Sequence, residues 1–189
     1  MIARYTRPEM AHVWSDENKF RQWREVELAA SDSLAELGIV PAEAAAKLRR
    51  FSGFKVARIF EIEREVKHDV IAFTTAISEN MAAAGHSDAS RWLHYGLTSN
   101  DVVDTAQALQ LVQASSILIG GLRKLAEALR LRAYEFKDTV QIGRTHGVHA
   151  EPITFGLKLA LWFDEVRRDE ARLRSSADEM RVGKISGAV

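Results

Sequence analysis

The chain has 189 residues, and its 26 Lys and Arg balance 26 Asp and Glu, so no net charge favours nucleic acid or an anionic membrane as a partner. Its 47% hydrophobic and 28% charged content is that of a soluble globular protein. Cysteine is absent, which excludes disulfides and thiolate metal sites and fits a reducing cytosol.

The first residues lack the apolar run of a secretory signal, and no run approaches the roughly 20 apolar residues of a membrane helix. We therefore expect a cytoplasmic protein with no membrane partner and no nucleic-acid partner. Pro8 disfavours helix at Arg7, so residues 4–8 are predicted to be extended. Arg4 and Tyr5 are candidates for binding a phosphate or carboxylate, although a solvated terminus is the simpler explanation of these residues alone.

Capping residues predict three helices in the first third of the chain. Ser15 or Asp16 caps a helix that Gly38 closes. Pro41 then opens a short helix, and helical apolar spacing resumes at Val56.

The triplet Lys67, His68 and Asp69 falls where this last helix meets a second apolar run. A partly buried histidine with a carboxylate neighbour has a charge state that its surroundings tune near neutral pH. A structural histidine with satisfied hydrogen bonds explains the same triplet, so both interpretations stand at this point.

A second polar stretch covers residues 92–101, and its Thr98 and Ser99 lead into a long helix that begins near Asp101. Hydroxyls and free backbone N–H groups at a helix N-terminus suit a carboxylate or phosphate. An N-cap with no further role is the alternative.

Two long helices are predicted over residues 101–136 and 153–181, with apolar residues three and four apart. Two such helices alone do not bury their apolar faces, so they need helices from a longer chain or from other subunits. We predict an all-α fold: a small helical domain over residues 1–96, and over residues 97–189 the first antiparallel helical hairpin of a long-helix bundle.

The turn of this hairpin holds the densest polar stretch, Gly-Arg-Thr-His-Gly-Val-His-Ala-Glu-Pro over residues 143–152. Two imidazoles, a guanidinium, a hydroxyl and a carboxylate next to two glycines favour a ligand site over a plain connection. The alternative is a connection whose histidines cap helix ends. Pro152 is predicted in the first turn of the following helix.

Residues 67–70, 94–101 and 143–152 together resemble the adenylosuccinate lyase branch of the fumarase/aspartase superfamily, and the resemblance runs from residue 4 to residue 189. It implies a β-elimination that releases fumarate from adenylosuccinate, leaving AMP, and from the succinylated aminoimidazole carboxamide ribotide, with no cofactor and no metal. His146 matches the general acid, and His68 matches a second catalytic group. The residues that match substrate-binding positions are Arg4, Tyr5, Lys67, His68, Asp69, His94, Thr98, Ser99 and Thr145.

The resemblance also implies a homotetramer whose active sites combine residues of different subunits. The family's base is a serine on a glycine-rich loop that has no match within these 189 residues, and Ser186 matches a different segment. We therefore expect the chain to be an N-terminal portion that does not turn over substrate by itself. Two alternatives are another lyase of the superfamily, such as an argininosuccinate lyase, and a non-catalytic helical module for oligomerisation.

Overall fold

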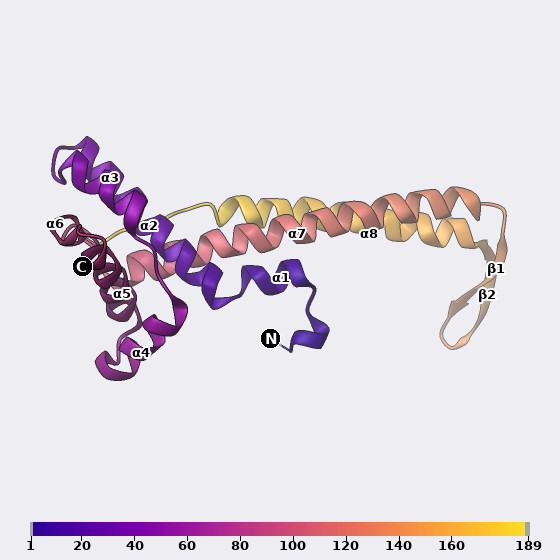
Figure 1. Cartoon of the computed structure of the whole chain (residues 1–189). Helices are drawn as coiled ribbons and strands as arrows, with labels where there is room; N and C mark the ends of the chain where they lie inside the picture. Colours follow the sequence, from indigo (N-terminus) through magenta and orange to yellow (C-terminus); the bar gives the residue numbers. More distant parts are fainter. Residues whose placement is uncertain (1, 188–189) are drawn as a thin grey trace. The chain divides into compact units, whose positions relative to one another are not determined.

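The computed structural model describes residues 2–187, and most of them are helical. This confirms the predicted fold class, with one short β-hairpin in addition. The elements in chain order are η1 (Ala3–Tyr5), α1 (Pro8–Val13), α2 (Asp16–Glu36), α3 (Ala42–Phe51), α4 (Val56–Val66), α5 (Asp69–Ala83), α6 (Ser87–Ser90), α7 (Ser99–Glu135), β1 (Val140–Thr145), β2 (Val148–Thr154) and α8 (Phe155–Glu179) (Figure 1).

These elements form two compact units, which are described separately. The first unit combines residues 2–111 with residues 181–187, and the hairpin unit covers residues 112–180. The division into domains at residue 96, proposed from the sequence, stays a prediction.

The helices of the first unit begin and end where capping residues predict. The Ser15 hydroxyl accepts the backbone N–H of Asn18 at 3.2 Å, and Gly38 closes the chain after α2 with a φ of +72°. Three short helices were not predicted: η1, α1 and α6. The extended segment expected over residues 4–8 is wrong, because η1 covers Arg4 and Tyr5 and Pro8 opens α1, while the preceding Arg7 is extended. Proline restricts the residue before it and is itself suited to the first helical turn.

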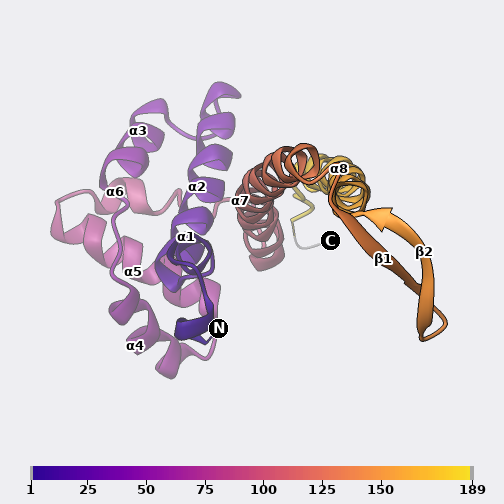
Figure 2. The same ribbon diagram turned by 90° about the vertical axis from the view of Figure 1, so that its right-hand side faces the viewer.

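An aromatic cluster lies at the centre of the first unit. Phe20 of α2 is fully buried, and its ring stacks on Phe73 of α5 with 5.8 Å between the ring centroids. Trp23 meets Phe20 edge-on at 5.2 Å. Offset and edge-on pairs are favourable beyond the area they bury, so this cluster joins α2 to α5. Figure 2 shows the ribbons of these helices.

The sequence predicted no segment that could cross a membrane, but the long helix α7 meets the criteria of length and composition. Among the described residues it is the one helix long and apolar enough to cross a membrane, judged by length and composition alone. Residues 105–122 carry no charge, but Gln107, Gln110 and Gln113 recur at every third position, so no long run of purely apolar residues marks the stretch in the sequence. A core helix of a soluble protein has the same composition, and α7 alone is weak evidence for a membrane.

In the hairpin unit, α8 lies antiparallel beside α7, and β1 and β2 extend from the end of the helix pair (Figure 1). The two strands form an antiparallel ribbon in place of the predicted loop. Pro152 is therefore in β2, opposite Ile142, and not in the first turn of a helix. The helix begins three residues later because the Thr154 hydroxyl accepts the N–H of Leu157 at 3.2 Å and caps it.

Gly156, in the first turn of α8, permits a close backbone approach to the end of α7 and to Lys137 just after it. A Cβ atom there would lie 2.6 Å from Cα and 2.7 Å from N of Lys137, and backbone atoms do not yield as a flexible side chain does. We expect Gly156→Ala to lower the free energy of unfolding by about 1–3 kcal/mol, as overpacking does. Gly120→Ala is the control: its Cβ meets open space in α7, so the change should raise helix stability by about 1 kcal/mol. Chemical denaturation of both variants measures the difference, and equal effects would contradict the close approach.

Candidate active site

His68 and Ser99, two of the predicted site residues, lie in contact in the first unit. His68 is the N-cap of α5, where its Nδ1 accepts the backbone N–H of Ile71 at 3.4 Å. Its other ring nitrogen, Nε2, is 3.4 Å from the hydroxyl of Ser99, the first residue of α7. Because Nδ1 acts as an acceptor, the proton of the neutral ring belongs on Nε2, which then donates to the Ser99 oxygen. The Ser99 hydroxyl proton remains free to donate to a ligand.

Thr98 and Asp101 form a capping pair at the start of α7. The backbone N–H of Thr98 donates to Oδ2 of Asp101 at 2.9 Å, the reciprocal half of a capping box. The backbone N–H of Thr98 is thus occupied by the protein itself, whereas no hydrogen bond from the Thr98 hydroxyl occurs within residues 2–187.

Asp101 also fixes the segment that follows α8. It is fully buried, and its Oδ1 accepts from the Lys184 ammonium at 3.0 Å and from the N–H of Ser186 at 2.9 Å. Oδ2 accepts from the N–H of Gly187 at 3.1 Å. Burial by itself raises the pKa of Asp101, but these N–H groups and the ammonium together hold it well below its ordinary range.

We expect Asp101→Asn to weaken the first unit specifically at neutral pH. Each carboxylate oxygen accepts from two donors, so either orientation of the amide places its NH₂ against two of them. The depressed pKa means that the stability due to the carboxylate is present above the ordinary carboxyl pKa and is lost as pH falls through the folded-state value.

Thermal unfolding from neutral to acid pH measures this effect. The difference in unfolding temperature between Asp101→Asn and the unaltered chain should be largest near neutral pH and small at acid pH. Asp104→Asn, an exposed position on the same helix, is the control. A gap of constant size, or one as large for Asp104→Asn, would contradict the role of the Asp101 charge.

His94 lies in the segment between α6 and α7 and pairs with the fully buried Glu27 of α2. Its Nδ1 is 2.6 Å from Oε1 of Glu27, and its backbone N–H donates to Oε2 at 2.8 Å. The Glu27 carboxylate raises the pKa of the His94 imidazole above its ordinary value, against the opposite effect of burial. Asp101 adds a smaller contribution of the same sign, so His94 is near the capping pair.

The other predicted residues of the first unit are exposed or contact only residues next to them in the sequence. Asp69 accepts the N–H of Val70 in the first turn of α5, and its Oδ1 is 3.5 Å from Nδ1 of His68. Lys67 is exposed in a left-handed conformation that ends α4, with a φ of 55°. Arg4 and Tyr5 are exposed in η1, where the Arg4 guanidinium donates to the Tyr5 hydroxyl at 2.9 Å.

Thr145 and His146 are in the hairpin unit, at the turn that joins β1 to β2. Thr145 pairs with Val148, and the two residues between them have positive φ angles, 51° for His146 and 73° for Gly147. Two such residues make a type I′ turn, whose twist matches that of the strands. The Thr145 hydroxyl is 2.7 Å from Nδ1 of His146, and both side chains are exposed. The turn thus presents a histidine and a hydroxyl together.

Some residues at this site were not predicted from the sequence. The spacing of Thr98 and Asp101 fits a capping box and could have indicated the role of Asp101. Glu27 falls on the apolar stripe of α2, and a carboxylate in such a stripe signals a buried partner. The contacts of Lys184 and Ser186 with Asp101 span more than 80 residues and leave no local signal.

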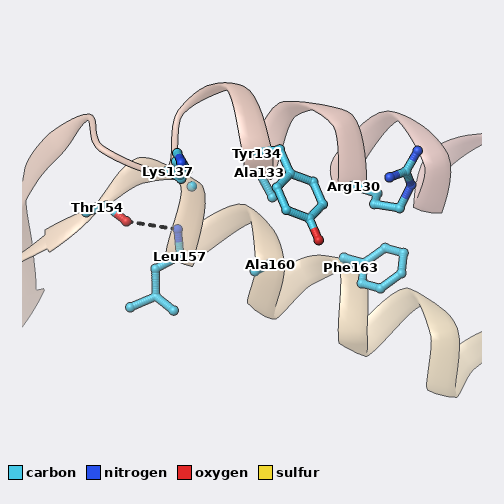
Figure 3. Close-up of a pocket in the computed structure, with 9 residues that line it drawn as sticks. Arg130, Ala133, Tyr134, Lys137, Thr154, Leu157, Ala160 and Phe163 are labelled. Carbon is cyan, nitrogen blue, oxygen red and sulfur yellow. Dashed lines mark hydrogen bonds between the residues drawn. The ribbon is translucent and has the colours of Figure 1, made fainter.

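The cavity of the hairpin unit does not mark the site. In the hairpin unit a cavity of about 500 Å³ opens between α7 and α8, and Tyr134 reaches from α7 toward α8 there (Figure 3). Its lining contains none of the predicted site residues. Among the described residues there is no group of three His, Cys, Asp or Glu that could hold a metal ion.

Comparison with known proteins defines the class of the chain. Residues 3–189 match the model of a protein family described as lyase, and the chain belongs to this family. The adenylosuccinate lyase of Bacillus subtilis strain 168 is 50% identical over 189 residues, which are 100% of this chain and 43% of that protein. The adenylosuccinate lyase of Synechocystis sp. strain PCC 6803 is 49% identical with the same coverage.

Solved structures agree with this class. A fumarate lyase from Mesorhizobium sp. BNC1 has a TM-score of 0.85 and 31% identity, over 95% of this chain and 42% of that one. A 3-carboxy-cis,cis-muconate lactonizing enzyme from Pseudomonas putida has a TM-score of 0.89 and 29% identity, over 97% and 42%. The predicted resemblance to an N-terminal portion of the adenylosuccinate lyases is confirmed, and the chain spans 43% of the length of those relatives.

Proposed function

We propose that the chain forms part of the active site of a lyase that eliminates fumarate from adenylosuccinate, leaving AMP, and from the succinylated aminoimidazole carboxamide ribotide. The observation that carries the proposal is the 50% identity to an adenylosuccinate lyase over every residue of the chain. The contact of His68 with Ser99 supports it, because a hydroxyl with a free proton beside an imidazole suits a carboxylate-bearing substrate.

In this proposal the hydroxyl groups and the imidazoles have different tasks. Thr98, Ser99 and Thr145 donate hydroxyls to the succinyl carboxylates, where negative charge develops as the proton leaves carbon. His146 is the general acid that protonates the departing nitrogen, a role suited to a group with a pKa near the operating pH. His68 is the second catalytic group.

The remaining predicted residues bind substrate in this proposal. Arg4 and Tyr5 bind the phosphate, and Lys67, Asp69 and His94 surround the nucleotide. The base that removes the carbon-bound proton is not among these residues. We therefore expect no turnover by the 189-residue chain alone.

A chimera tests the proposal. The 189 residues of this chain replace the matching residues of the Bacillus subtilis adenylosuccinate lyase, and the purified chimera is assayed with adenylosuccinate and with argininosuccinate. We expect turnover of adenylosuccinate only. A folded chimera without activity would overturn the proposal, and turnover of argininosuccinate would favour another lyase of the superfamily.

We also propose that the chain assembles with other copies, as a homotetramer in the complete enzyme, in the cytoplasm. Large apolar side chains on α7 and α8 are between 48% and 62% exposed, namely Leu118, Leu125, Leu131, Leu157 and Leu161. Leu157 also lines the cavity of Figure 3. Partner helices would bury these apolar side chains.

Light scattering over a range of chain concentrations tests assembly. We expect the mass to exceed that of a monomer and to rise with concentration. A well-dispersed monomer at every concentration would contradict the proposal, as would full retention of assembly after Leu118→Glu and Leu125→Glu together.

A further inference from the structure

Glu27 is a buried carboxylate with a single residue as its partner. It lies on the buried face of α2 and is fully inaccessible to solvent. Among residues 2–187, both of its oxygens bond only to His94: Oε1 to the ring and Oε2 to the backbone N–H. A buried carboxylate needs a compensating charge or hydrogen bonds, so one residue, 67 positions away, supplies all of its compensation.

The two bonds hold His94 in an uncommon conformation. Its φ of 62° lies in the left-handed region, where a residue with a side chain is strained. Because one carboxylate receives both the backbone N–H and the ring nitrogen, it fixes the backbone and the side-chain rotamer together. Strain of this kind persists only where the surroundings over-determine it.

The pairing also decides where the proton of the ring lies. With Glu27 ionised, both of its oxygens are acceptors, so Nδ1 carries a hydrogen. Nε2, on the other edge of the ring, has no hydrogen-bond partner within the described part of the chain, and the side chain is 19% exposed. The other charges nearby are Asp101, whose field reaches His94, and Lys184, which is 3.0 Å from Asp101.

We infer that Glu27 is a positioning residue that holds His94 as an oriented imidazolium, with its Nε2–H directed to an anionic oxygen of the substrate. The inference rests on the proposed function for the identity of that substrate, but the pairing itself is a property of this chain. His94 binds through Nε2, and Glu27 acts only through His94.

Nitrogen-15 NMR of the unaltered chain tests the pairing without any activity. The His94 signals are assigned by their absence in His94→Gln. We expect protons on both ring nitrogens at neutral pH, and retention of the Nδ1 proton when the ring becomes neutral in alkali. A neutral ring at pH 7 with its proton on Nε2 would overturn the inference.

Variants of Glu27 test whether its carboxylate raises the pKa of His94. Glu27→Gln keeps the shape and can still accept one N–H, but it removes the charge, so the pKa of His94 should fall toward its ordinary value. Glu27→Asp keeps the charge and should restore part of the increase. Glu25→Gln, two residues away on the same helix and partly exposed, is the control and should leave His94 unchanged. An unchanged His94 titration in Glu27→Gln would show that the carboxylate does not govern the ring.

The chimera links the pairing to substrate. If the imidazolium is required, kcat/KM falls as pH rises through the pKa of His94. In Glu27→Gln this fall in kcat/KM should occur at a lower pH. We expect a loss of about 10–100-fold in kcat/KM at neutral pH, as when the partner of an oriented metal-binding histidine is removed. An unchanged pH profile in an active Glu27→Gln chimera would overturn the substrate role. An inactive unaltered chimera would instead contradict the proposed function, and the NMR titration would still decide the pairing.

Discussion

Replacing His146 by Gln in the chimera is expected to lower kcat by about 10²–10⁴-fold, the usual contribution of a positioned acid. Gln keeps a hydrogen-bonding group at the turn between β1 and β2, but its amide protons are not acidic enough to be transferred to the leaving nitrogen. KM should change much less, because the proton is transferred in the transition state and contributes little to ground-state binding. Steady-state kinetics with adenylosuccinate measure both constants.

His149→Gln is the matched control. His149 is in β2, opposite Arg144 and outside the two-residue turn that presents His146. His149→Gln should therefore lower kcat less than His146→Gln does. Equal losses in the two variants, or an increase in KM with kcat intact for His146→Gln, would show that the acid is another residue, with His68 and His94 the next candidates.

Phe20→Ala should have the largest effect on stability, lowering the free energy of unfolding by about 3–5 kcal/mol. Phe20 is fully buried and its ring meets Trp23, Phe54, Phe60 and Phe73. The cavity left between α2 and α5 is lined by these four rings, which cannot all move inward.

Urea denaturation of the chain measures this loss. Phe60→Ala serves as the comparison, because Phe60 is only partly buried and touches the same cluster from α4. We expect Phe60→Ala to cost clearly less than Phe20→Ala. Similar losses of unfolding free energy in the two variants would contradict the central place of Phe20. So would a Phe20→Ala loss below about 1 kcal/mol, which is typical of a surface substitution.

Helices were the most predictable part of the fold, because their signals are local. Ser15 and Gly38 bound α2 through contacts within a few residues, and the apolar spacing of α7 and α8 extends over many turns. The β-ribbon was not predicted. Its strands are short, and its turn uses His146 and Gly147 where Asn-Gly is the familiar signal.

The site was predictable only in its residue types. The sequence places His68 and Ser99 in separate polar stretches, but their contact depends on the packing of α5 against the start of α7. The role of Glu27 was even harder to predict from the sequence, because its position fits the apolar face of α2 and its partner is 67 residues away. Long-range pairs of this kind follow from the tertiary fold and leave no periodic pattern in the sequence.

Product analysis of the chimera tests the proposed elimination most directly. Adenylosuccinate is incubated with the chimera, and proton NMR follows the four-carbon product and the nucleotide. Elimination predicts fumarate and AMP in equal amounts, with no aspartate, and their formation should be slowed about 10²–10⁴-fold in His146→Gln. Release of aspartate, which signals hydrolysis of the other C–N bond, or no reaction by a folded chimera, would contradict the assignment of this chain to fumarate elimination.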